Sequence, residues 1–113
     1  MATEKATVEF ILQKLRPAGR FSARAMFGEY ALYADERVVA LVCDDRLYVK
    51  ILPASKALEL ECEQASPYPG AKPHYIVEEG QLSTMETLPG ILLSVAASIP
   101  ERKKKGSGMR SGG

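Results

Sequence analysis

The residue types that most often catalyse reactions or bind metals are few in this chain. The one histidine, His74, has no neighbouring ligand set, so a surface or strand-edge histidine is expected rather than a metal ligand or general base. Neither Cys43 nor Cys62 has a histidine in a recognisable motif beside it, which argues against nucleophilic catalysis. Two cysteines also form neither a disulfide framework nor a metal quartet, so two reduced thiols are expected.

Paired acids are the other candidates for acid–base or divalent-ion chemistry. They occur at Asp35-Glu36, Asp44-Asp45 and Glu78-Glu79. Adjacent residues on a strand point to opposite faces, and turn tips are solvated, so we interpret these pairs as solubilising turns. Gly28 stands alone and forms no phosphate-binding loop. The sequence therefore predicts a protein that is not an enzyme and has no cofactor and no metal.

The first two acidic pairs divide residues 24–51 into three apolar runs. Apolar runs separated by two-residue breaks are typical of tight hairpins, so the spacing predicts an antiparallel three-stranded meander. Asp-Glu and Asp-Asp are weaker turn pairs than Asn-Gly, because glycine adopts positive φ more easily. Counting outward from each turn places Ala40 opposite Ala31 on one side and opposite Val49 on the other.

This register sorts the side chains of the meander onto two faces. Small residues let helices approach closely, so we assign to the helix-covered core the face with Ala31, Tyr33, Val38, Ala40, Val42, Leu47, Val49 and Ile51. The other face is too apolar for a solvated surface and indicates an interface. Its candidate contact residues, for a homodimer or a protein partner, are Tyr30, Leu32, Val39, Leu41 and Tyr48, with Cys43 beside them and Arg46 and Lys50 at the edge.

Helical periodicity and turn signals predict the remaining elements. Thr3 is the expected N-cap of the first helix. The expected elements are a helix over 4–15, a first strand over 21–34 that bends at Gly28, the two further meander strands, a helix over 53–63, a strand over 74–77 and a helix over 87–99, with a further short strand near Tyr68. The order α-β-β-β-α-β-α predicts a two-layer α+β fold in which helices pack on an antiparallel sheet.

A chain of 113 residues has room for one compact core, which we place in residues 1–99. This part holds 10 basic and 13 acidic residues, a net charge of −3, which argues against broad capture of nucleic acid by the fold itself. Residues 100–113 are predicted to be a disordered basic tail. Its weak nucleic-acid candidates are Arg102, Lys103, Lys104, Lys105 and Arg110. The absence of a signal peptide and of a bilayer-spanning apolar run leads us to expect a cytoplasmic protein.

Two motifs carry a family resemblance. They are Arg24-x-Met26-Phe27-Gly28-x-Tyr30-x-Leu32-Tyr33 and Ala40-Leu41-Val42-x-Asp44-Asp45-x-Leu47-Tyr48-x-Lys50. Together they resemble the signature of the TfoX N-terminal domain, and the similarity extends more loosely over residues 3–99. Glu29 and Ala31 stand where members commonly have glycine. TfoX regulators also carry a second, C-terminal domain, and this chain stops before one could begin.

The resemblance implies a fold with helices against an antiparallel sheet, as in secretion-chaperone-like folds. It also implies a regulatory role, because the family includes the TfoX/Sxy activators of natural competence, whose Sxy-type members assist the cAMP receptor protein at promoters. Two hypotheses stay open. One is a TfoX-type regulator that acts in transcription, with the transcription machinery as partner. The other is a stand-alone protein-interaction or dimerisation module that does not bind DNA directly.

Overall fold

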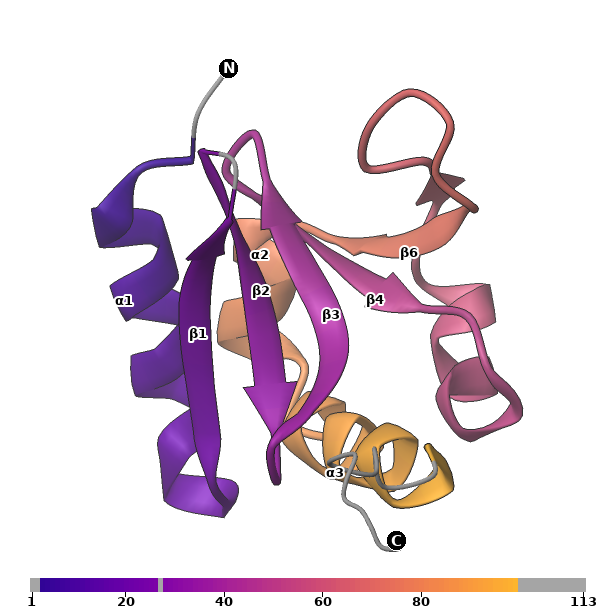
Figure 1. Ribbon diagram of the computed structural model, residues 1–113. Helices are drawn as coiled ribbons and strands as arrows, with labels where there is room; N and C mark the ends of the chain where they lie inside the picture. The colour runs from indigo at the N-terminus through magenta and orange to yellow at the C-terminus, as the bar shows by residue number, and fades with distance from the viewer. Residues whose placement is uncertain (1–2, 27, 100–113) are drawn as a thin grey trace, which may run out of the picture.

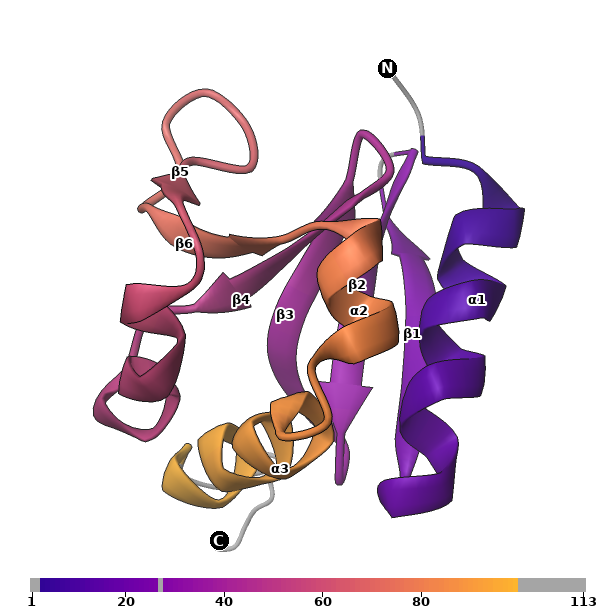
Figure 2. The same ribbon diagram turned by 180° about the vertical axis from the view of Figure 1, so that it is seen from behind.

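The computed structural model describes residues 3–26 and 28–99. They form an antiparallel sheet of six strands in the order β1-β2-β3-β4-β6-β5, with the helices gathered on one side of it (Figures 1 and 2). The α+β fold predicted from the sequence is confirmed. The elements are α1 (Lys5–Leu15), η1 (Arg16–Ala18), β1 (Phe21–Met26), β2 (Glu29–Ala34), β3 (Arg37–Cys43), β4 (Arg46–Lys50), η2 (Pro53–Leu60), β5 (Gln64–Ala65), β6 (His74–Val77), α2 (Glu79–Thr84) and α3 (Leu88–Ser98). The predicted basic tail lies outside the described residues.

Two elements depart from the predicted order, one strand and one helix. The extra strand arises because the chain reverses where only a bend was expected. The first strand is a hairpin: β1 and β2 pair antiparallel, with Phe21 opposite Ala34 and Met26 opposite Glu29. Gly28 has a φ of +82°, a value that glycine adopts without the steric cost other residues meet. The Glu78-Glu79 pair, interpreted as a turn, instead begins the short helix α2. The sheet therefore has a strand, and the helical layer a helix, that the sequence did not predict.

The remaining predicted elements differ in detail. The helix over 53–63 is the 3-10 helix η2, and the further short strand is β5 rather than a strand near Tyr68. The helix at the end of the described chain is confirmed as α3. No helix in residues 3–26 and 28–99 has the length and apolar character needed to cross a membrane. Location in the cytoplasm stays a prediction.

The N-terminus of α1 is capped by a residue far away in the sequence. The backbone N–H of Glu4 and the hydroxyl of Thr7 both donate to Asp45 Oδ1, at 2.8 and 2.9 Å. A carboxylate at this position satisfies an otherwise unpaired N–H and interacts favourably with the helix dipole. Thr3 is therefore not the N-cap, because its hydroxyl lies between the Glu29 carboxylate and the Val42 carbonyl.

Both acidic pairs of the meander form the predicted tight turns. Asp35, Glu36, Asp44 and Asp45 have φ between +51° and +68°. Positive φ at both central residues is the type I′ geometry that matches the twist of a hairpin. Non-glycine residues adopt this conformation at a cost of about 1–2 kcal/mol each. The two turns share this strain, but only the second one also caps α1.

Replacing Glu36 and Asp45 with glycine one at a time should therefore change stability in opposite directions. Glu36→Gly removes the strain and loses only an exposed ion pair with Arg20 at 3.5 Å, so we expect a gain of about 0.5 kcal/mol. Asp45→Gly removes the same strain but also the cap of α1, so a net loss of about 0.5–1 kcal/mol is expected. Urea unfolding of the two variants measures the contrast. Equal effects of the two substitutions would contradict the capping role of Asp45.

A β-bulge changes the predicted register between β2 and β3. Tyr33 lies opposite Val38 as expected, but Ala40 lies opposite Leu32 rather than Ala31, because Val39 is an extra residue on β3. The predicted pairing of β3 with β4 is confirmed, with Ala40 opposite Val49. A shift of one residue moves a side chain to the other face of the sheet. The face assignment made for β2 is therefore inverted.

The main core shows this inversion directly. Leu32 and Val39, assigned from the sequence to the interface face, have no solvent exposure and pack in the main core with α1 and α3. Tyr30 is half-buried against the same core. Ala31 and Tyr33, which the sequence assigned to the core face, lie on the opposite face instead, because their partners on β3 are Leu41 and Val38. Helices therefore cover the face that contains Leu32, Ala40, Val42, Leu47 and Val49.

Candidate functional site

The face of the sheet that the helices leave uncovered is the first candidate site, and we call it the open face. It is turned toward the viewer in Figure 1, while α1, α2 and α3 lie behind the strands. Its central row crosses five neighbouring strands, because each residue lies opposite the next: Arg24, Ala31, Leu41, Tyr48 and Ile76. The flanking pairs are Tyr33 with Val38, Cys43 with Arg46, and Lys50 with His74.

The open face has an apolar cluster of its own. Cys43, Tyr48 and Ile76 are 4–6% exposed and form a buried cluster that is separate from the main core. Leu41 and Ala65 pack against it and stay partly exposed. Strands of a sheet with one solvated face alternate apolar and polar residues, and β3 does not. The prediction that both faces of the meander are apolar is therefore confirmed.

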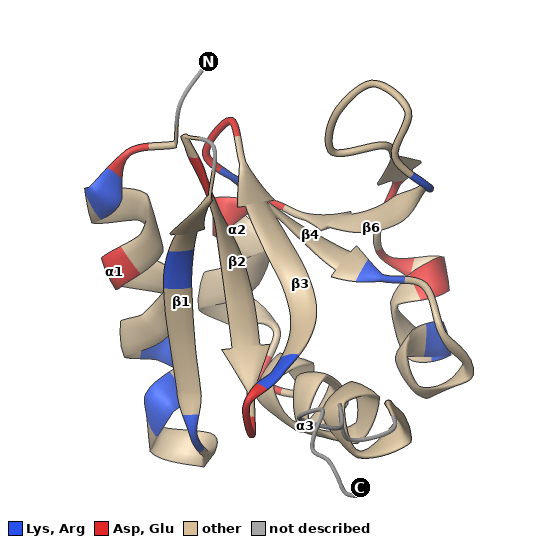
Figure 3. Ribbon diagram, viewed as in Figure 1, with Lys and Arg blue, Asp and Glu red and all other residues tan. Residues whose placement is uncertain are grey.

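The charge of the open face is mainly basic. Arg24, Arg46 and Lys50 belong to it by strand register. The acidic residues of the meander lie at the strand ends and turns (Figure 3). The guanidinium of Arg24 lies 5.5 Å from the centre of the Tyr33 ring, within the range of a cation–π interaction. A hydrogen bond with Tyr48, and next the Glu78 carboxylate, raise the pKa of Arg46 above its usual value. These contacts orient two arginines around the apolar cluster.

The structure brings together only part of the predicted interface. Leu41, Tyr48, Arg46 and Lys50 share the open face, and Tyr30, Leu32 and Val39 lie on the helix side because of the bulge. Whether the residues on the open face contact a partner stays a prediction. Sequence reasoning missed Arg24, Tyr33 and Ile76 as members of this face. The apolar strand around Ile76 was predicted, but its pairing with β4 had no local signal. The five basic candidates in the tail lie outside the described residues.

The two cysteines lie in surroundings that oppose ionisation. Burial, and next the charges of Glu29 and Asp44, raise the pKa of Cys43 to about 11. Burial, and next the charge of Glu61, raise the pKa of Cys62. Because the thiolate is the reactive form, both thiols are weak nucleophiles at neutral pH. His74 has Nδ1 2.8 Å from the Lys72 carbonyl oxygen and contacts neither cysteine by a hydrogen bond within the described chain.

Within residues 3–26 and 28–99, no three or more His, Cys, Asp or Glu side chains converge as metal ligands. The acidic residues around Asp45 instead hold the chain together: the N–H of Asp44 donates to Glu29 Oε1 at 3.2 Å, and that of Asp45 to the Thr3 hydroxyl at 3.4 Å. Asp44 and Asp45, the acidic pair of the second sequence motif, therefore connect the turn between β3 and β4 to Glu29 and to the start of α1.

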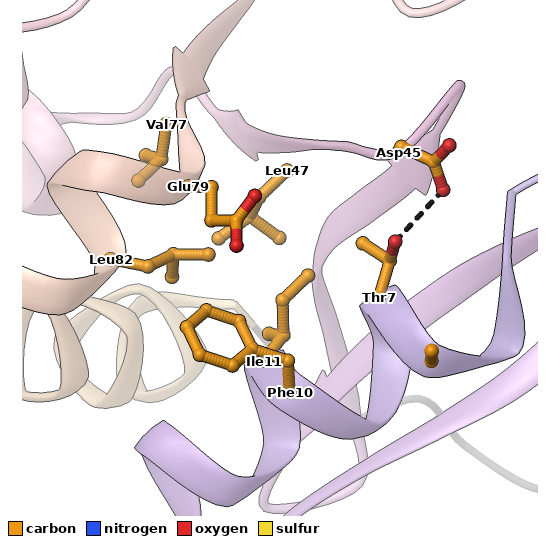
Figure 4. A pocket seen from close by; sticks show the side chains of 9 residues that line it. Thr7, Phe10, Ile11, Asp45, Leu47, Val77, Glu79 and Leu82 are labelled. Carbon is orange, nitrogen blue, oxygen red and sulfur yellow. Dashed lines mark hydrogen bonds between the residues drawn. The ribbon is translucent and has the colours of Figure 1, made fainter.

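A second candidate site lies on the helix side, and we call it the α1–α2 pocket. It has a volume of about 370 Å³ and lies between α1, α2 and the strands β4 and β6 (Figure 4). The floor is apolar, and the pocket is lined by Ala6, Thr7, Phe10, Ile11, Asp45, Leu47, Val77, Glu79 and Leu82. The sequence offered no signal for this pocket, because α2 itself was not predicted.

Comparison with known proteins gives two findings. The model of the TfoX N-terminal domain matches residues 13–89, which include both motifs noted in the sequence. An "Uncharacterized 12.7 kDa protein in trpE 5'region" of Spirochaeta aurantia is 34% identical over 108 residues, which cover 93% of this chain and 90% of that protein. The family match extends over more than half of the chain, and the chain therefore belongs to the TfoX N-terminal domain family.

Proposed function

We propose that this protein is a non-enzymatic regulatory domain that acts in transcription by binding a protein partner through the open face. The observation that carries the proposal is the apolar cluster of Cys43, Tyr48 and Ile76, which lies on a sheet face without helices and has Arg24 and Arg46 at its border. Membership of the TfoX N-terminal domain family supports a regulatory role.

The residue types on the open face favour a macromolecular partner. Tyr and Arg are enriched among the residues that contribute most to protein–protein affinity. Here Arg24 lies over the ring of Tyr33, and Arg46 Nε lies 3.8 Å from the Glu78 carboxylate, so both arginines are partly ordered before a partner arrives. Side chains that are already ordered lose less entropy on binding. The open face therefore has a central apolar region and a polar border, as interfaces commonly do.

The charges of the open face indicate which partner fits. Arg24, Arg46 and Lys50 would meet like charges on a second copy that packed face to face, and like charges at an interface reduce affinity. A partner with acidic side chains around an apolar centre would instead be complementary. We therefore place an acidic protein surface first.

A second copy of the chain is the other candidate, and one observation favours it. The border of the open face also carries an acid: Glu78 Oε1 lies 3.8 Å from Arg46 Nε. Two copies related by a two-fold axis could exchange this ion pair and relieve part of the repulsion.

Purification of the tagged chain from its native cells, with and without nuclease, tests the proposal against its alternatives. We expect a protein that stays bound after nuclease treatment, is retained by Leu60→Glu and is lost with Leu41→Glu. Leu60 is a matched control because it is 94% exposed and lies on η2, away from the sheet. Loss of all bound material on nuclease treatment would indicate nucleic acid instead. Light scattering that shows a wild-type dimer and a Leu41→Glu monomer would support the second copy.

A further inference from the structure

We infer that the α1–α2 pocket binds a small organic amine in its protonated form. The pocket lies on the helix side of the sheet, so this inference does not depend on the function proposed for the open face. Its volume of about 370 Å³ falls at the small end of the range for ligand sites, which extends over roughly 300–1,000 Å³. The pocket can therefore hold a short hydrocarbon group together with one polar head.

The floor of the pocket selects for hydrocarbon. Ile11 from α1, Leu47 from β4 and Leu82 from α2 line it together with Val77, and all four are at most 8% exposed. These side chains are packed into the core from behind, so the floor is formed before a ligand binds. Such a surface offers no hydrogen-bond partner to a polar group and interacts best with an apolar chain or ring.

The border of the pocket selects for positive charge. Two carboxylates lie there, Glu79 on the α2 side and Asp45 on the α1 side, and neither Lys nor Arg lines the pocket. Figure 4 shows the Glu79 carboxylate directed over the floor between Leu47 and Leu82. Within the described chain, Glu79 has no ion-pair partner, whereas Asp45 Oδ1 already accepts from α1. Glu79 is therefore the carboxylate placed to meet an incoming ammonium.

Phe10 adds a third feature that favours an amine. Its half-buried ring lies at the border of the pocket, and the ammonium of Lys14 lies 5.4 Å from the ring centre. Lys14 thus takes one face of the ring, and the opposite face is the one that a second cation could use. An ammonium on a chain of a few carbons would contact the carboxylate of Glu79 and the apolar floor at the same time, beside the Phe10 ring.

Titration of the ¹⁵N-labelled protein with n-hexylammonium, hexanol and hexanoate tests the inference. We expect n-hexylammonium to shift the amide signals of Leu47, Val77 and Leu82 with at least tenfold higher affinity than hexanol, and hexanoate to leave them unchanged. Raising the salt concentration should weaken amine binding, because Glu79 is exposed to solvent. Equal binding of amine and alcohol would overturn the inference, since it would reduce the site to a non-selective apolar pocket. The absence of any shift would overturn it as well.

Two variants that change the net charge equally test whether Glu79 is the carboxylate that binds the ammonium. Glu79→Gln should lower the affinity for n-hexylammonium about tenfold while leaving hexanol binding unchanged. Glu86→Gln should leave both affinities unchanged, because Glu86 lies outside the pocket lining. Both residues are exposed, so both variants should fold, and their ¹⁵N spectra verify this. An equal loss in the two variants would mean that the long-range charge of the protein, and not the pocket, attracts the amine.

Discussion

Replacing Leu32 with glutamate should unfold the domain, whereas the same replacement at Leu41 should leave it folded. Leu32 has no solvent exposure and packs in the main core, where an unpaired carboxylate costs more than about 4 kcal/mol. A domain of this size has a total stability of about 5–15 kcal/mol, and at the lower end of this range such a loss unfolds it. Leu41 is partly exposed on the open face, where the new carboxylate stays hydrated and a loss of about 1 kcal/mol is expected.

Circular dichroism and thermal unfolding of the two variants measure this difference. The pair is informative because without the bulge at Val39 both leucines would point to the same face and respond alike. If Leu41→Glu unfolds the chain and Leu32→Glu melts close to the wild-type temperature, the helices cover the other face of the sheet, and the open face as defined here does not exist.

Replacing Ser55 with alanine should cost about 1–3 kcal/mol, although only one oxygen atom is removed. Ser55 is fully buried, accepts from the Leu52 N–H at 3.0 Å and donates to the Lys50 carbonyl at 2.6 Å. Without its hydroxyl, these two backbone groups lose their partner at the point where the chain leaves β4 for η2. The melting temperature should fall by about 4–8 °C for each kcal/mol lost.

Ser94→Ala is the matched control for this effect. Ser94 lies in α3 and is exposed, so its replacement should be neutral or slightly stabilising through the higher helix propensity of alanine. A Ser55→Ala variant that melts within 1–2 °C of the wild type, a shift below the range just estimated, would mean that water or a backbone shift replaces the hydroxyl.

The local features of the meander could be predicted from sequence, and the long-range ones could not. Two-residue acidic breaks between apolar runs identify the turns at Asp35-Glu36 and Asp44-Asp45, because turn geometry depends on the residues of the turn itself. The helix of Val8, Ile11 and Leu15 follows from spacing for the same reason. The cap of α1 does not, because Asp45 is 41 residues away from Glu4.

Only part of the candidate interface was predicted correctly, because the bulge in β3 places some of the predicted residues on the helix side of the sheet. Leu41, Tyr48, Arg46 and Lys50 come from β3 and β4, whose register follows directly from the turn between them. The extra residue at Val39 lets two residues of β3 lie opposite one of β2, and no local residue type marks this site. The reversal at Gly28 and the helix from Glu79 were missed although each has a local feature. Gly28 has a positive φ, and the N–H of Glu78 donates to the side chain of Gln81, three residues on.

The affinity of the purified partner for three forms of the chain decides whether the open face is the binding surface. Isothermal titration should show at least tenfold weaker binding for Leu41→Glu than for the wild type, because truncating or charging a central interface residue costs about 2 kcal/mol or more. Leu60→Glu should bind within about twofold of the wild type, since this exposed leucine lies away from the sheet. Equal affinities of folded Leu41→Glu and the wild type would show that the partner binds elsewhere on the molecule.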